Sequence, residues 1–114
     1  YFLLKHIFKR KRPHISHNII KTIEPPDKFS FPSGHSASAT LLVLILMDQS
    51  SVLAPYFIGW MFIIFLSRIG LGLHYISDVI GGITLGVISF FVTLEISKFN
   101  LSLNHYVFEV LSNF

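Results

Sequence analysis

A histidine and an aspartate stand four residues apart in a long apolar stretch, a short distance after an arginine. On a helix, His74 and Asp78 would share one face. The carboxylate could accept one imidazole N–H and leave the second ring nitrogen free as a nucleophile. The planar guanidinium of Arg68 suits phosphate oxygens. Charged groups in apolar surroundings usually mark a functional site. We therefore expect phosphate chemistry here, with an Arg–Asp ion pair beside a buried histidine as the simpler alternative.

A second group of polar residues stands where an earlier apolar stretch begins. Ser33 has a side chain suited to a helix N-cap, and Gly34 would let an anion approach the free backbone N–H groups of the first turn. His35 would stand at the edge of that anion site. The alternative is an ordinary helix start with an incidental histidine. That alternative is stronger for Ser33 alone than for the whole set.

Basic residues gather just before the first proline of the chain. They are Lys5, Lys9, Arg10, Lys11 and Arg12. Lys5 and Arg12 are seven residues apart, about two helical turns, so a helix that ends near Lys11, before Pro13, would bring them to nearly the same face. A basic cluster beside apolar segments indicates phosphate or anionic lipid headgroups as partners and argues against nucleic acid. A solvated patch at a membrane edge is the alternative.

The composition is that of a small membrane protein. Of the 114 residues, 52% are hydrophobic and 13% are charged, with a net charge of +3. The absence of cysteine excludes disulfides and thiolate metal sites. The chain opens at Tyr1 directly into apolar residues and shows no signal peptide. We therefore expect a piece of a longer protein whose upstream helices are missing.

The apolar stretches predict an all-α fold, a multi-helix transmembrane bundle. After the end of a first helix and a loop over residues 14–31, we expect three complete spans, over residues 33–48, 55–66 and 76–98. An up-and-down path through these spans would bring the three polar clusters to one side of the membrane.

Two features of the last span bear on packing and domain division. Gly82 and Gly86 form the small-xxx-small pattern of close helix contacts. We expect residues 1–98 to form the catalytic core and residues 99–114 to form an amphipathic tail.

Three signatures occur in order along the chain. They are Lys5, six residues, then Arg12-Pro13; Pro32-Ser33-Gly34-His35; and Ser67-Arg68, five residues, His74, three residues, Asp78. Together they resemble the type 2 phosphatidic acid phosphatase (PAP2) superfamily, which also includes vanadium haloperoxidases and glucose-6-phosphatase. They span about two-thirds of the chain, and the combination is far more specific than any one signature.

The resemblance implies a role for each matched residue. His74 would attack phosphorus and form a phosphohistidine, and Asp78 would orient His74. His35 would protonate the leaving oxygen and then activate water. The phosphate-binding residues would be Lys5, Arg12, Ser33, Gly34 and Arg68. The family needs neither a metal nor another cofactor, so we expect none here.

The sequence thus predicts an integral membrane phosphatase that hydrolyses a lipid phosphate or an isoprenyl or lipid diphosphate. The alternatives are a vanadium-dependent haloperoxidase-like enzyme and a non-catalytic membrane scaffold or lipid-binding module. In a bacterium the protein would lie in the inner membrane, with its site near the membrane surface. The positive-inside rule would make that surface cytoplasmic, whereas bacterial relatives often face the periplasm, so both orientations stay open. Nothing indicates the oligomeric state.

Overall fold

The described part of the chain is helical. The computed structural model describes residues 2–13 and 28–112, with side chains up to residue 105. Its helices are α1 (Phe2–Phe8), α3 (Gly34–Asp48), α4 (Ala54–Gly70) and α5 (Ile76–Ser112). Within those two ranges the extended pairing is limited to one isolated bridge between Lys11 and Phe29. The all-α prediction is confirmed, while most of the expected loop over residues 14–31 lies outside the described residues.

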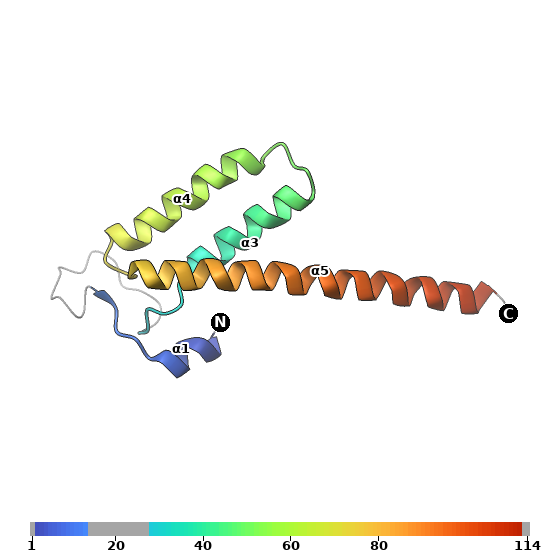
Figure 1. The fold of residues 1–114 in the computed structure, drawn as a ribbon, viewed down its shortest axis with the longest axis horizontal. Helices are drawn as coiled ribbons and strands as arrows, with labels where there is room; N and C mark the ends of the chain where they lie inside the picture. Colours follow the sequence, from blue (N-terminus) through green and yellow to red (C-terminus); the bar gives the residue numbers. More distant parts are fainter. Residues whose placement is uncertain (1, 14–27, 113–114) are drawn as a thin grey trace.

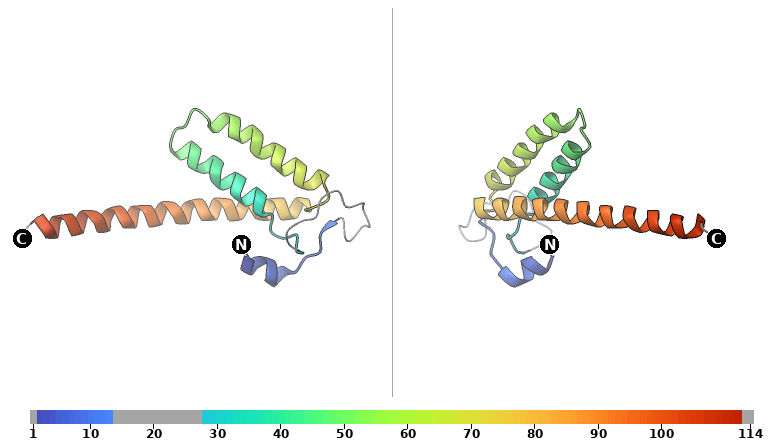
Figure 2. Two further views of the ribbon diagram at one scale, coloured as in Figure 1. Left: turned by 180° about the vertical axis from the view of Figure 1, so that it is seen from behind. Right: turned by 45° about the vertical axis from the view of Figure 1, so that its right-hand side comes forward.

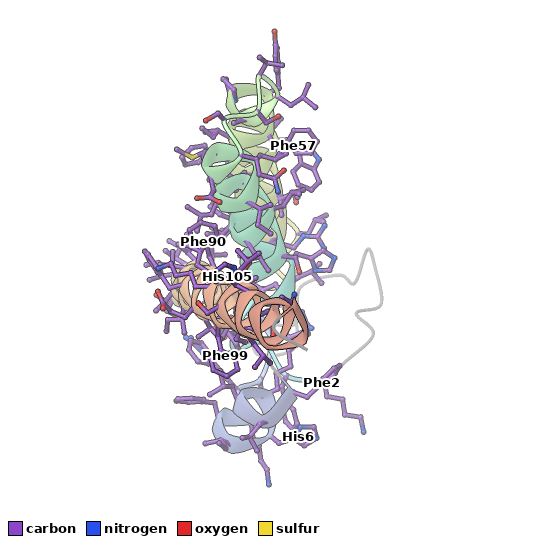
Figure 3. The ribbon with its side chains drawn as sticks, turned by 90° about the vertical axis from the view of Figure 1, so that its right-hand side faces the viewer. Phe2, His6, Phe57, Phe90, Phe99 and His105 are labelled. Atoms are coloured by element: carbon purple, nitrogen blue, oxygen red, sulfur yellow. The ribbon has the colours of Figure 1, made fainter. Side chains whose placement is uncertain are left out.

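The helices are arranged around the first half of α5. Helices α3 and α4 run antiparallel as a hairpin on one side of it, and α1 lies on the other side (Figure 1). The view along α5 shows the same opposition (Figure 3). The C-terminal half of α5 extends well beyond the other described helices (Figure 2). The packed end of α5 is therefore the end that carries Asp78.

Local sequence explains how α3 and α4 begin and end. Ser33 caps α3, as predicted: its side chain accepts the backbone N–H of Ser36. Helix α4 carries a proline in its first turn, where a missing N–H costs nothing, and continues four residues past the predicted end at residue 66, to Gly70. Gly72 then adopts a φ of 64°, a left-handed conformation that glycine accepts without strain.

The end of α1 differs from the prediction. The helix stops at Phe8, not near Lys11, because Lys9 adopts a left-handed φ of 45°. Lys11 is then extended and pairs with Phe29. Lys5 and Arg12 therefore do not share a helix face. They reach the same region because the chain turns after α1.

The end of α5 also differs from the prediction. The expected helix end near Lys98 is wrong, since α5 is one helix of 37 residues. From Val87 to Ser112 the sequence has neither glycine nor proline to stop it. An exposed ion pair of 2.7 Å between Lys98 and Glu95 lies just before the expected boundary. The division into a core and a tail at this point stays a prediction.

Only α5, among the described helices, is long and apolar enough to cross a membrane. Its candidate span of 30 residues measures about 45 Å, against roughly 30 Å of hydrocarbon. Helices α3 and α4 are apolar but have 15 and 17 residues, fewer than the roughly 20 of a complete span. The expectation of three complete spans is therefore not met.

Large apolar side chains are nevertheless exposed on α4 and α5, among them Phe62, Ile63, Leu66, Phe91 and Phe99. Such surfaces need lipid or other helices.

Two glycines allow α5 to lie directly on α3. A Cβ atom at Gly82 would meet the Ser33 carbonyl, and one at Gly86 would lie 2.6 Å from the Ala37 carbonyl oxygen. The predicted small-residue packing motif is thus confirmed. As a consequence, the start of α3, which carries His35, is held against the start of α5, which carries Asp78.

Candidate active site

His74 and Asp78 are buried where α5 begins. Their side chains are 4% and 0% exposed, and His74 Nδ1 lies 3.7 Å from Asp78 Oδ2, beyond hydrogen-bond distance. Oδ2 accepts the backbone N–H of Tyr75 at 2.8 Å. This bond caps the first turn of α5, as the acidic residue of a capping box does. Asp78 therefore has a structural task as well as a position beside the imidazole.

The surroundings of His74 select one tautomer. Arg12 Nη1 lies 3.4 Å from His74 Nε2. A guanidinium can only donate, so Nε2 presents its lone pair, and we assign the ring proton to Nδ1, on the side of Asp78. Within the described residues His74 Nδ1 has no hydrogen-bond partner. The unprotonated nitrogen, the one able to attack phosphorus, thus faces a buried cation.

Lys5 and Arg12 are buried cations held by backbone carbonyls. Lys5 is 2% exposed and Arg12 is 3% exposed. Lys5 Nζ donates to the Phe29 carbonyl at 2.9 Å, and Arg12 Nη1 donates to the Leu73 carbonyl at 3.0 Å. Because lysine and arginine are almost never fully buried unless they are paired, both are candidates for anion ligands.

Arg68 anchors the segment that leads to His74. Its backbone carbonyl accepts the N–H groups of Leu73 at 3.2 Å and His74 at 3.1 Å. The Nε atom of its side chain is buried and lacks a hydrogen-bond partner in the described part of the chain. Such a donor is costly to leave unpaired, which is expected of a site that is completed by an anionic ligand.

Ser33 and Gly34 are joined to the His74 side of the site through the backbone. The Ser33 N–H donates to the Asp78 carbonyl at 2.9 Å. The Ser33 hydroxyl oxygen accepts from Ser36 Oγ at 2.9 Å. Ser33 also begins the 15-residue α3, whose first-turn N–H groups are suited to an anion.

His35 is exposed in the first turn of α3 and lies within the field of the other site residues. Partial burial of the ring lowers the pKa of His35 below its ordinary value, and the positive charges of Arg68, of His74 when protonated, of Arg12 and of Lys5 lower it further. His35 therefore lies in the electrostatic field of cations from both other clusters, Lys5 and Arg12 from one and Arg68 from the other. An anion bound among them would cancel their effect and restore the tendency of His35 to hold a proton.

A cavity of about 630 Å³ continues from this site between α3, α4 and α5. Gly34 and His35 line one end of it. The remaining walls are largely apolar and include Leu41, Leu42, Trp60, Ile64 and Leu85. A polar end joined to an apolar groove suits an amphiphilic ligand with a charged headgroup.

Comparison with known proteins identifies the family. The sequence model of the PAP2 superfamily matches residues 1–102. The chain belongs to the PAP2 superfamily. The match covers all three predicted signatures and α5 as far as residue 102.

Curated PAP2-type relatives are lipid phosphatases by name. The chain is 36% identical over 81 residues to decaprenylphosphoryl-5-phosphoribose phosphatase of Mycolicibacterium smegmatis, covering 70% of this chain and 43% of that protein. It is 31% identical to phosphatidylglycerophosphatase B of Bacillus subtilis, covering 79% and 47%, and 28% identical to undecaprenyl-diphosphatase BcrC of the same species, covering 84% and 50%. The chain thus spans about half the length of these relatives. No solved structure matches it.

Sequence reasoning missed one residue beside the PAP2 signatures. Arg10 Nη1 donates to Asp78 Oδ1 at 2.8 Å, so the cation paired with Asp78 is Arg10 and not Arg68, as the simpler alternative supposed. Arg10 and Arg12 are two residues apart on extended backbone, and alternate residues there share a face. A prediction that α1 ends before Arg10 would have indicated that Arg10 and Arg12 share a face. The basic cluster alone did not show which of its cations would contact Asp78.

Acidic and histidine side chains do not form a metal site in the described residues. Groups of three or more His, Cys, Asp or Glu side chains with a suitable arrangement are not found there. The cations of the site are Lys5, Arg12 and Arg68. Charge stabilisation at this centre is therefore available from the protein's own basic groups.

Proposed function

We propose that this protein is an integral membrane phosphatase that removes phosphate from a lipid phosphate or an isoprenyl or lipid diphosphate through a phosphohistidine intermediate and without a metal ion. The observation that carries the proposal is the position of His74. Its Nε2 lies 3.4 Å from Nη1 of buried Arg12. Arg68, whose Nε is buried without a hydrogen-bond partner among the described residues, anchors the segment before His74 through its backbone carbonyl. A nucleophile beside buried cationic donors suits a phosphoryl group.

The first step is attack on phosphorus. The lone pair of His74 Nε2 forms the N–P bond while the P–O bond to the lipid breaks, and its electron pair goes to the leaving oxygen. Lys5, Arg12 and Arg68 would meet the negative charge on the three equatorial oxygens, together with the N–H groups at the start of α3. Asp78 would hold the imidazole, which becomes positively charged as the bond forms.

His35 would serve first as acid and then as base. Because nearby cations and burial lower its pKa, His35 is poorly suited to hold a proton in the empty site. A bound phosphate cancels part of that field, so the proton is taken up with the substrate and delivered to the leaving oxygen. Neutral His35 can then deprotonate the water that breaks the N–P bond and releases inorganic phosphate.

Two features support a lipid as the leaving group. The cavity that begins at Gly34 and His35 continues between apolar walls of α3, α4 and α5. The curated relatives carry names of enzymes for prenyl and glycerolipid phosphates. We infer that α5 and the exposed apolar faces hold the protein in the membrane, the inner membrane in a bacterium, with the site near one surface.

The direct test is phosphate release by the complete protein in detergent micelles. Dioctanoyl phosphatidic acid, phosphatidylglycerol phosphate and undecaprenyl diphosphate form a suitable panel. We expect release from at least one of them by the wild type and almost none by His74→Ala. A wild-type protein that binds these lipids without releasing phosphate would instead support a non-catalytic lipid-binding module.

A further inference from the structure

Arg10 contacts Oδ1 of the Asp78 carboxylate, whereas the Tyr75 N–H contacts Oδ2. Arg10 Nη1 donates to Asp78 Oδ1 at 2.8 Å and to Ser77 Oγ at 2.6 Å. The other oxygen, Oδ2, accepts the Tyr75 N–H and lies on the side of His74. Arg10 and the Tyr75 N–H thus hold different oxygens of the carboxylate, and together they set which oxygen faces the imidazole.

We propose that Arg10 is a positioning residue that holds the Asp78 carboxylate in the orientation needed to align His74. The inference rests on the proposed function, since it assigns Arg10 a part in the attack by His74. Neither the three signatures nor the simpler ion-pair interpretation assigns a role to this residue. Asp78 is fully buried, and a buried carboxylate without a cation would be strongly unfavourable.

Arg10 is itself held in place from two directions. Its guanidinium lies 4.1 Å above the ring centre of Tyr75, a cation–π contact. Its backbone carbonyl accepts the Ser30 N–H at 2.8 Å, which ties the segment after α1 to the chain just before α3. A side chain fixed at both its backbone and its head can impose an orientation on its partner.

The position of Arg10 separates it from the phosphate ligands. Its side chain is 39% exposed, whereas Lys5 and Arg12 are buried. Its side chain contacts Asp78, Ser77 and Tyr75. A residue in this position affects the nucleophile through Asp78 and does not contact the phosphate.

The test compares kinetic parameters of the complete protein in detergent micelles, with dioctanoyl phosphatidic acid as the substrate. Arg10→Gln removes the charge. Arg10→Lys keeps a cation whose N–H groups can reach Asp78 Oδ1 and Ser77 Oγ. Lys11→Gln removes an equal charge from the next, exposed residue and is the matched control. We expect Arg10→Gln to lower kcat roughly ten- to hundredfold, the range typical for loss of a partner that orients an active-site histidine, with KM and the inhibition constant of inorganic phosphate changed less than about threefold.

A double-mutant cycle distinguishes positioning from a merely structural role. In the Asp78→Asn background, Arg10→Gln should cause no further loss of kcat, because the interaction that it disrupts is already gone. Arg10→Lys should recover much of the activity and covers the case in which Arg10→Gln does not fold. In that case the smaller loss of kcat caused by Arg10→Lys must also disappear in the Asp78→Asn background. Equal fold-losses in both backgrounds, or a loss explained by weaker phosphate binding, would overturn the proposal.

A second readout does not depend on turnover. The ¹⁵N shifts of the His74 imidazole report its tautomer, and Arg10→Gln should move them in the same direction as Asp78→Asn, while Lys11→Gln leaves them unchanged. Unchanged His74 signals in a folded Arg10→Gln protein would overturn the role of Arg10 whether or not the enzyme turns over. A wild type that releases no phosphate, with the His74 signals coupled to Arg10, would overturn only the phosphatase proposal.

Discussion

The close contact at Gly82 predicts that the methyl group of an alanine at this position will push the start of α3, with His35, away from the start of α5, with Asp78. A Cβ atom at residue 82 would lie 2.9 Å from Ser36 Cβ and closer still to the Ser33 carbonyl. Ordinary van der Waals contact begins at 3.4 Å, so the first gap alone must open by 3.4 − 2.9 = 0.5 Å. The backbone carbonyl cannot rotate away, because it accepts the Ala37 N–H in the first turn of α3.

The expected result of Gly82→Ala is a large loss of activity in a protein that stays folded. A shift of roughly 1 Å between catalytic groups can cost about a hundredfold in rate, and here it would move Ser33, Gly34 and His35 away from His74. Overpacking costs about 1–3 kcal/mol of stability, partly offset by about 1 kcal/mol from the better helix propensity of alanine. We therefore expect kcat to fall about a hundredfold, with a net stability change of no more than about 2 kcal/mol.

The assay is phosphate release under saturating lipid phosphate, alongside thermal unfolding of each variant. Gly59→Ala is the matched control, because a Cβ atom there meets nothing within 4 Å. It lies in α4, away from the α3–α5 contact. A Gly82→Ala protein that keeps kcat within about twofold of the wild type would refute the idea that this contact sets the catalytic geometry.

Three further predictions concern the chemistry itself. His35→Ala should lose much more activity on lipid phosphates than on an aryl phosphate, because a good leaving group needs less protonation; equal losses would contradict its role as acid. Vanadate should inhibit the wild type, since its five-coordinate form imitates the transition state at His74, and EDTA should not; activity lost in EDTA and restored by Mg²⁺ would refute the metal-free mechanism. Arg68→Gln should raise the pKa of His35 towards its ordinary value, because a positive charge that lowers it is removed; a histidine NMR titration with no change would show that Arg68 does not act on this site.

Local sequence determined much of the fold and most of the site. The N-cap at Ser33 and the proline at the start of α4 act within one helical turn, so the chain near each of them is sufficient to predict the helix start. The predicted shared helix face of His74 and Asp78 is wrong, because α5 begins at Ile76 and His74 lies in the bend before it; the two side chains are nevertheless close. The small-residue pattern at Gly82 and Gly86 correctly predicted a close helix contact, although it did not name the partner helix.

Only the tertiary structure decided which cation meets Asp78 and how the basic cluster is divided. Arg10 and Asp78 are 68 residues apart in sequence, and their contact depends on the left-handed turn at Lys9 and on the pairing of Lys11 with Phe29. Neither feature follows from local propensity, because a lysine with positive φ is stabilised by its surroundings and not by its own side chain. The basic cluster before Pro13 predicted that cations lie near this end of the bundle. Which of them is buried beside His74 and which lies half-exposed against Asp78 was decided by the path of the backbone between α1 and α3.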